Sequence, residues 1–196
     1  MPAVSRTKAP GKAVKVIAGS ALEVRSGDHV RHEANERDSE SSLVTGHDDE
    51  PHIQITHFGD VYRVGPTRRI ELIKSGVPAQ DVARIARSMD RSKEQISKTL
   101  GLAVSTVDRK AKENQRLTTE QGERLVGLAK LIGQVQTMVE ESGEPDGFNA
   151  AQWLADWLER TVPALGGRRP AEFMDTAEGR ELVSKVLAMT QSGAYA

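Results

Sequence analysis

The chain has 196 residues, of which 37% are hydrophobic and 28% charged, the composition of one or two ordinary globular domains. It contains no cysteine, which excludes disulfide frameworks and thiolate zinc sites and favours a reducing compartment, the cytoplasm. No apolar run has the length of a signal sequence core or a membrane span, so no membrane association is expected.

The net charge of −1 hides a segregation along the chain. Residues 67–116 hold 12 Lys or Arg against 6 Asp or Glu, whereas residues 117–196 hold 7 against 12. The first of these segments suits a polyanion such as nucleic acid, and the second would be repelled by one.

Residues 1–60 show little hydrophobic periodicity, which predicts a flexible or loosely structured arm. At its end, the β-favouring residues of HIQITHFGDVYRV (52–64) predict a strand or a short hairpin around Gly59 and Asp60. The five histidines all lie in this region, and His29 with His32 lacks an ordered scaffold, so no metal site is predicted.

Helical periodicity begins near Thr67 and continues to about residue 140, which predicts a domain over 61–140. Thr118 and Gln121 have the spacing of a capping box before a long helix. Five apolar residues then form one stripe, which indicates either core or a dimer interface: Leu125, Leu128, Ile132, Val135 and Val139.

Residues 93–112 have the spacing of a helix-turn-helix, with small Ser97, Gly101 at the turn and Val107 on the second helix. Such a second helix lies in the DNA major groove and offers Ser105, Thr106, Arg109 and Lys110 to base edges. The remaining cations near it, Lys93, Lys98, Lys112 and Arg116, suit phosphates.

Breaker-rich residues 141–147 predict a linker to a small helical domain over 148–196, so the fold class is all-α. Asn149 caps a helix that carries Trp153 and Trp157 on one face, with Phe148 placed as a hydrophobic staple. The tryptophans suit a small core, or a partner-facing edge. Asp175 is expected to cap a last helix with the apolar stripe Leu182, Val183, Val186 and Leu187, ended by Gly193.

The run from Trp153 to Ala196 resembles the toxin-binding domain of the Xre/MbcA/ParS family of antitoxins, which act with RES-domain toxins. The likeness is carried by these elements in order: Trp153-Leu154, Pro163-Ala164-Leu165-Gly166-Gly167 followed by Arg168, Arg169 and Pro170, Thr176 with Gly179, and Gly193-Ala194-Tyr195-Ala196. The run RLTTEQGERLVGLAKLIGQ is similar to the end of the family's helix-turn-helix domain, so the resemblance spans about residues 67–196.

The resemblance implies an antitoxin with no catalysis and no cofactor of its own. It implies a homodimer formed through the helix-turn-helix half, repression of its own operon at operator DNA, and a complex with a toxin that consumes NAD or transfers ADP-ribose from it. The toxin-binding residues expected on this basis are Trp153, Trp157, Arg168, Arg169 and the tail Gly193, Ala194, Tyr195 and Ala196, which would enter the toxin's active-site cleft.

Two alternatives remain open at this stage. Arg168 and Arg169 suit carboxylates on a toxin, the ends of neighbouring helices or, less well, a phosphate. The whole chain also suits a stand-alone helix-turn-helix regulator whose acidic half is a dimerisation or ligand-sensing domain.

Overall fold

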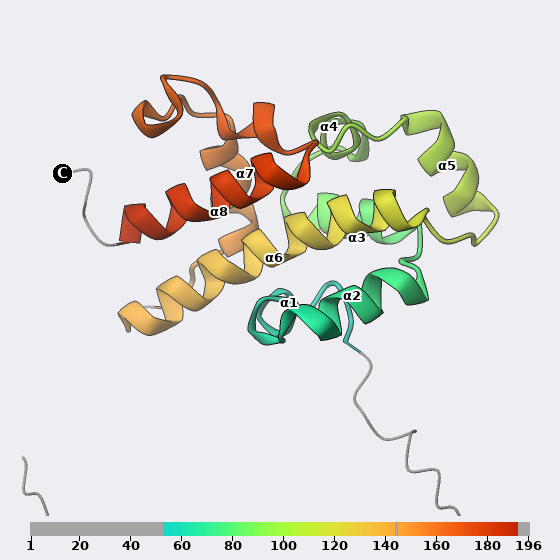
Figure 1. Cartoon of the computed structure of the whole chain (residues 1–196), viewed down its shortest axis with the longest axis horizontal. Coiled ribbons are helices and arrows are strands. Elements are labelled where there is room, and N and C mark those ends of the chain that lie inside the picture. The colour runs from blue at the N-terminus through green and yellow to red at the C-terminus, as the bar shows by residue number, and fades with distance from the viewer. Residues whose placement is uncertain (1–52, 144, 192–196) are drawn as a thin grey trace, which may run out of the picture. The chain divides into compact units, whose positions relative to one another are not determined.

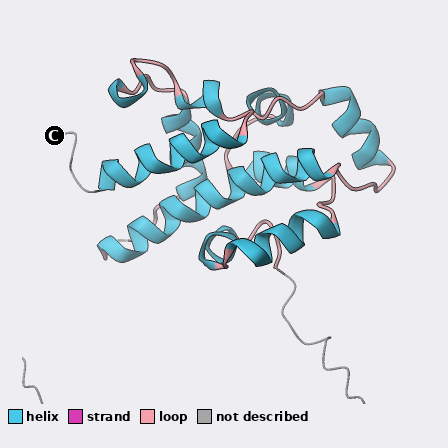
Figure 2. Cartoon of the chain, in the orientation of Figure 1, coloured by secondary structure: helices cyan, strands magenta, loops and turns pink. Residues whose placement is uncertain are grey.

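The computed structural model describes residues 53–143 and 145–191, and within them every regular element is a helix (Figure 1, Figure 2). The all-α prediction is therefore confirmed. The elements are α1 (Phe58–Arg63), α2 (Pro66–Ser75), α3 (Asp81–Ser88), α4 (Lys93–Thr99), α5 (Val104–Lys112), α6 (Thr119–Ser142), α7 (Ala150–Leu158), the 3-10 turns η1 (Pro163–Leu165) and η2 (Pro170–Phe173), and α8 (Ala177–Gln191). None of the helices in these ranges combines the length and apolarity needed to cross a membrane.

Helix α1 occupies the stretch for which a strand was expected, so that prediction was wrong. The deciding contact is tertiary: α1 packs on α6, and Val61 is fully buried there. A Cβ atom at Gly133 of α6 would lie 1.9 Å from the Phe58 carbonyl oxygen, so only glycine permits this approach of the two backbones. Local β-propensity is weak enough for such packing to override it.

Helices α4 and α5 form the predicted helix-turn-helix. A capping box of Ser92 and Gln95 begins α4, and Gly101 has a φ of +62° at the turn. Ser97 and Val107 are both 0% exposed, so the two helices meet at the small residue and the apolar residue that the spacing indicated.

Helix α6 is the element that the rest of the described chain packs around. Helices α1 and α2 lie along one side of it, and α7 and α8 along another (Figure 1). The predicted capping box of Thr118 and Gln121 is present at its start. Leu125, Leu128, Ile132 and Val135 are buried in a core that both halves of the chain share, so this stripe is core and not a free dimer interface.

The four elements from α7 to α8 follow the predicted turns with two differences. The Asn149 side chain caps α7, and Gly166 and Gly167 turn the chain with φ of +66° and +75°. The cap of α8, however, is Thr176 and not Asp175: its hydroxyl accepts from the Gly179 N–H at 3.0 Å, because only the residue directly before the helix can reach its third N–H.

The second difference concerns the apolar stripe of α8. Val183, Val186 and Leu187 are buried, but Leu182 is 40% exposed and lies outside the core. Residue 182 is adjacent to the buried face but not on it, because consecutive helical residues point about 100° apart. Gly193, expected to end this helix, lies outside the described residues.

Candidate functional site

Helix α5 presents a polar face to solvent. Ser105, Arg109 and Lys112 are exposed, and Thr106 and Lys110 are half-buried, while Val107 holds the opposite face in the core. The predicted base-reading residues therefore share one accessible helix, the geometry required of a recognition helix.

Several cations of this surface already have partners within the chain. Lys93 Nζ lies 2.5 Å from Asp108, and this hydrogen bond raises the pKa of Lys93. Arg109 donates to Glu113 at 3.0 Å. Lys110 donates to the Arg116 carbonyl oxygen at 3.0 Å, which ties the end of α5 to the following loop.

Lys98 and Lys112, by contrast, make no ion pair within residues 53–143 and 145–191, so their charge is fully available to a phosphate. Arg116, expected at a phosphate, donates to the Gly76 carbonyl and so fastens the chain after α5 to the end of α2. Its backbone also pairs with Pro78.

A hollow of about 470 Å³ beside α5 adds two cations that the sequence reasoning did not select. Arg84 and Arg87 of α3 line it together with Lys93 and Lys112, and Asp108 is its single carboxylate. Arg84 also pairs with Asp81 at 2.7 Å. Arg84 and Arg87 are three residues apart, so the sequence already indicates that they share one side of a helix. Only the packing of α3 beside α5 shows which surface these arginines join.

The aromatic residues of the acidic half form a short row. The rings of Trp153 and Trp157 are stacked, with centroids 6.2 Å apart and planes 11° apart, and Phe148 lies 6.3 Å from Trp153 as the staple spacing predicted. Trp157 is only 8% exposed and belongs to the core. Trp153 is half-buried and Phe148 exposed, so these two supply the accessible aromatic edge.

Arg168 and Arg169 both face carboxylates of their own chain. Arg168 Nε donates to Glu172 at 3.1 Å and its guanidinium lies 4.4 Å from the centre of the Phe173 ring. Arg169 donates through its side chain to Glu159 at 3.2 Å and through its backbone N–H to Glu172 at 3.0 Å. These donors, the backbone N–H of Arg169 first and Arg168 second, lower the pKa of Glu172.

Comparison with known proteins assigns both halves of the chain. Residues 68–130 match the antitoxin Xre-like helix-turn-helix domain, and residues 146–193 match the antitoxin Xre/MbcA/ParS C-terminal toxin-binding domain. A protein of Sphingobium sp. (strain YBL2), named Prs ADP-ribosylating antitoxin, is 48% identical over 136 residues, which cover 69% of this chain and 86% of that protein. This chain belongs to the Xre/MbcA/ParS family of antitoxins.

The antitoxin therefore has a helix-turn-helix domain followed by a toxin-binding domain, and neither matched domain is a catalytic one. The first ends within α6 and the second begins before α7, so α6 is the helix on which the two meet. The predicted toxin-binding residues Gly193, Ala194, Tyr195 and Ala196 lie outside the described residues.

Polar contacts join the toxin-binding domain to α6. Arg180 of α8, 8% exposed, donates to Glu123 at 3.0 Å and to the Met174 carbonyl oxygen at 3.1 Å. Burial lowers the pKa of Arg180, and the Glu123 carboxylate partly offsets this. Gln134 of α6 exchanges two hydrogen bonds with Ser184, at 2.7 and 2.9 Å. These bonds set the register of α8 on α6, because a buried polar group needs its partner in one place.

Proposed function

We propose that this antitoxin neutralises a RES-domain toxin by inserting its carboxyl-terminal tail into the toxin's active-site cleft. The observation that carries the proposal is the match of residues 146–193 to the toxin-binding domain, directly ahead of that tail. The 48% identical relative is named as a Prs ADP-ribosylating antitoxin, which supports a toxin that transfers ADP-ribose from NAD.

The chemistry of the tail fits a nucleotide pocket. Gly193, Ala194 and Ala196 are slim, and Tyr195 supplies a ring that stacks where a base would stack. Helix α8 extends to Gln191, so this chemistry lies within the five residues that follow the packed domain.

Contacts outside the tail would hold the toxin on the domain surface. Trp153 with Phe148 offers an apolar edge, and interfaces are enriched in such aromatic residues. Arg168 and Arg169 are exposed on the segment before η2, and toxin carboxylates would compete there with Glu172 and Glu159. We expect Trp157 to act indirectly, by supporting Trp153 from the core.

The helix-turn-helix half is proposed to bind operator DNA as a homodimer and to repress the antitoxin's own operon. Support comes from the exposed face of α5 and from the cation-lined hollow that Arg84, Arg87, Lys93 and Lys112 share. A dimer would place two copies of α5 in successive major grooves, about 34 Å apart.

The tail is tested by inhibition and binding together. Deletion of residues 193–196 from the full chain is expected to abolish protection of cells from the co-expressed toxin, while the toxin still co-purifies because the domain surface remains. A chain of unchanged length with Tyr195→Ser is the matched control for tail length. If the shortened chain protects cells as well as the full one, tail insertion is wrong. If no toxin co-purifies with the full chain, toxin binding by residues 148–196 is wrong, and a stand-alone regulator becomes the better account of the protein.

The DNA surface is tested by the salt dependence of operator binding. Lys112→Ala removes one phosphate contact and is expected to reduce the slope of log K against log salt by about 1. Arg109→Ala removes a base contact, with an expected loss of about 1–3 kcal/mol on the operator and little change on unrelated DNA. Lys185→Ala, on the exposed face of α8, is the control cation. Equal slopes and affinities for all three would contradict this placement of the interface.

A further inference from the structure

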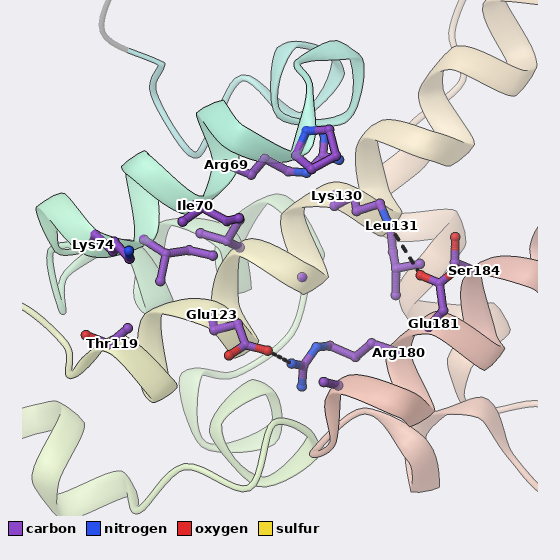
Figure 3. Close-up of a pocket in the computed structure, with 15 residues that line it drawn as sticks. Arg69, Ile70, Lys74, Thr119, Glu123, Lys130, Leu131, Arg180, Glu181 and Ser184 are labelled. Atoms are coloured by element: carbon purple, nitrogen blue, oxygen red, sulfur yellow. Dashed lines mark hydrogen bonds and ion pairs between the residues drawn. The ribbon is translucent and has the colours of Figure 1, made fainter.

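A second hollow, of about 420 Å³, lies between α2, α6 and α8 on a part of the surface that neither proposed activity uses (Figure 3). Its walls come from both domains: α2 and α6 contribute Ile70, Ile73, Lys74 and Val126, and α8 contributes Arg180 and Glu181. Its volume is within the range of cavities that hold small molecules.

The floor of this hollow is apolar. Val126 and Leu131 of α6 are buried beneath it, and Ile73 of α2 is half-buried at its side. Ile70 is 49% exposed at the rim. It lies on α2, a helix that has no fully buried residue. Gly127 has no side chain, and a Cβ there would lie 2.6 Å from Arg180 Nε, so the glycine allows the Arg180 side chain to lie against α6 at the edge of the hollow.

The charges of the hollow are unequally paired. Glu123 is bound by Arg180 at 3.0 Å, and Glu181 lies 3.7 Å from Lys130 (Figure 3). With both carboxylates occupied, two cations of the lining have no acidic partner within residues 53–143 and 145–191. They lie at the α2 wall.

These two cations are Arg69 and Lys74. In the part of the chain that the structure describes, Arg69 donates only to carbonyl oxygens, those of Val61 at 3.2 Å and Tyr62 at 3.1 Å among them. Lys74 is exposed and makes no hydrogen bond or ion pair with any residue that the structure describes. An apolar floor next to an uncompensated ammonium is complementary to a molecule with a hydrocarbon body and one anionic group.

We propose that this hollow binds a small amphipathic anion, such as a medium-chain aliphatic carboxylate, with its hydrocarbon over Ile70, Val126 and Leu131 and its carboxylate on Lys74. Such a ligand would contact α2 of the helix-turn-helix half and α8 of the toxin-binding half at once. The site depends on neither the tail nor α5, so it stands whether or not the functions proposed above hold.

Three ten-carbon probes test the proposal by calorimetric titration of the full chain: decanoate, decanol and decyltrimethylammonium. We expect saturable binding of one decanoate per chain and at least tenfold weaker binding of the other two. Lys74→Glu is expected to weaken decanoate binding at least tenfold, and Lys185→Glu, the same change on an exposed lysine that does not line the hollow, to leave it unchanged.

A second pair of variants tests the apolar contact. Ile70→Gln is expected to weaken decanoate binding several-fold, whereas Leu182→Gln, at a comparably exposed apolar residue of α8 outside the lining, is not. Absence of saturable decanoate binding, or equal binding of all three probes, overturns the proposal. The proposal is also overturned if the wild-type chain is a dimer and Ile70→Asp makes it monomeric, because a second copy of the chain would then occupy the hollow.

Discussion

Ser97 lies at the contact between α4 and α5 with a hydroxyl that has no hydrogen-bond partner in the described part of the protein. The residue is 0% exposed, so the hydroxyl has left water without gaining a replacement bond. Ser97→Ala keeps the small side chain that the helix crossing needs and removes the unpaired polar group. We therefore expect this substitution to stabilise the protein.

The size of the effect follows from three contributions. An unpaired buried hydroxyl costs about 1–3 kcal/mol, and its removal recovers that amount. Alanine adds up to about 0.5 kcal/mol through its higher helix propensity. The void left by one oxygen atom subtracts about 0.3 kcal/mol at roughly 24 cal/mol per Å³. The expected net gain is about 1–3 kcal/mol, or about 3–9 °C in Tm for a chain of this length.

Urea unfolding of the full chain, followed by circular dichroism, measures this gain as a shift of the midpoint at constant slope. Ser105→Ala makes the same chemical change at an exposed helical position and reports the propensity contribution alone. The burial argument is refuted if Ser97→Ala stabilises no more than Ser105→Ala, since the Ser97 hydroxyl would then carry no desolvation penalty.

Three further substitutions probe the turns and caps. Gly101→Ala is expected to destabilise by about 1–2 kcal/mol, because φ is +62° and a Cβ would lie 2.8 Å from Arg124 Nη1; urea midpoints no lower than wild type would contradict this. Thr176→Ala removes the cap of α8 at a cost of about 1 kcal/mol by the same measurement, and Thr176→Ser should restore most of it. Glu172 has a pKa below its ordinary 4.5, so its stabilising contribution is present above that pH and is lost as the pH falls through the lowered folded-state value. Glu172→Gln should thus be less stable than wild type at neutral pH and equal to it in acid. A difference in stability that does not change with pH would contradict a stabilising role of the ionised Glu172 carboxylate.

Much of the helix-turn-helix was accessible from the sequence because its signals are local. Ser97, Gly101 and Val107 are fixed by short spacings, and the Thr118 capping box involves residues three apart. The acidic half was found through its resemblance to a family, and comparison confirmed that family over residues 146–193.

The strand expected at 52–64, the cap of α8 and the position of Leu182 depended on tertiary structure. Propensity in a short segment is worth less than packing, and α1 forms a helix because Gly133, far along the chain, lets its backbone approach α6. Arg84 and Arg87 join the α5 surface only when α3 packs beside it.

The sequence by itself determined the helices after Thr67, most of their turns and the division into a basic and an acidic half, because these depend on residues close together in the chain. Only the tertiary structure decided that α6 supplies one core to both halves and that Lys74 lines an apolar hollow with no counter-ion among the described residues. Glu123 and Arg180, which join α6 to α8, are 57 residues apart in the sequence, and no local pattern encodes such a contact.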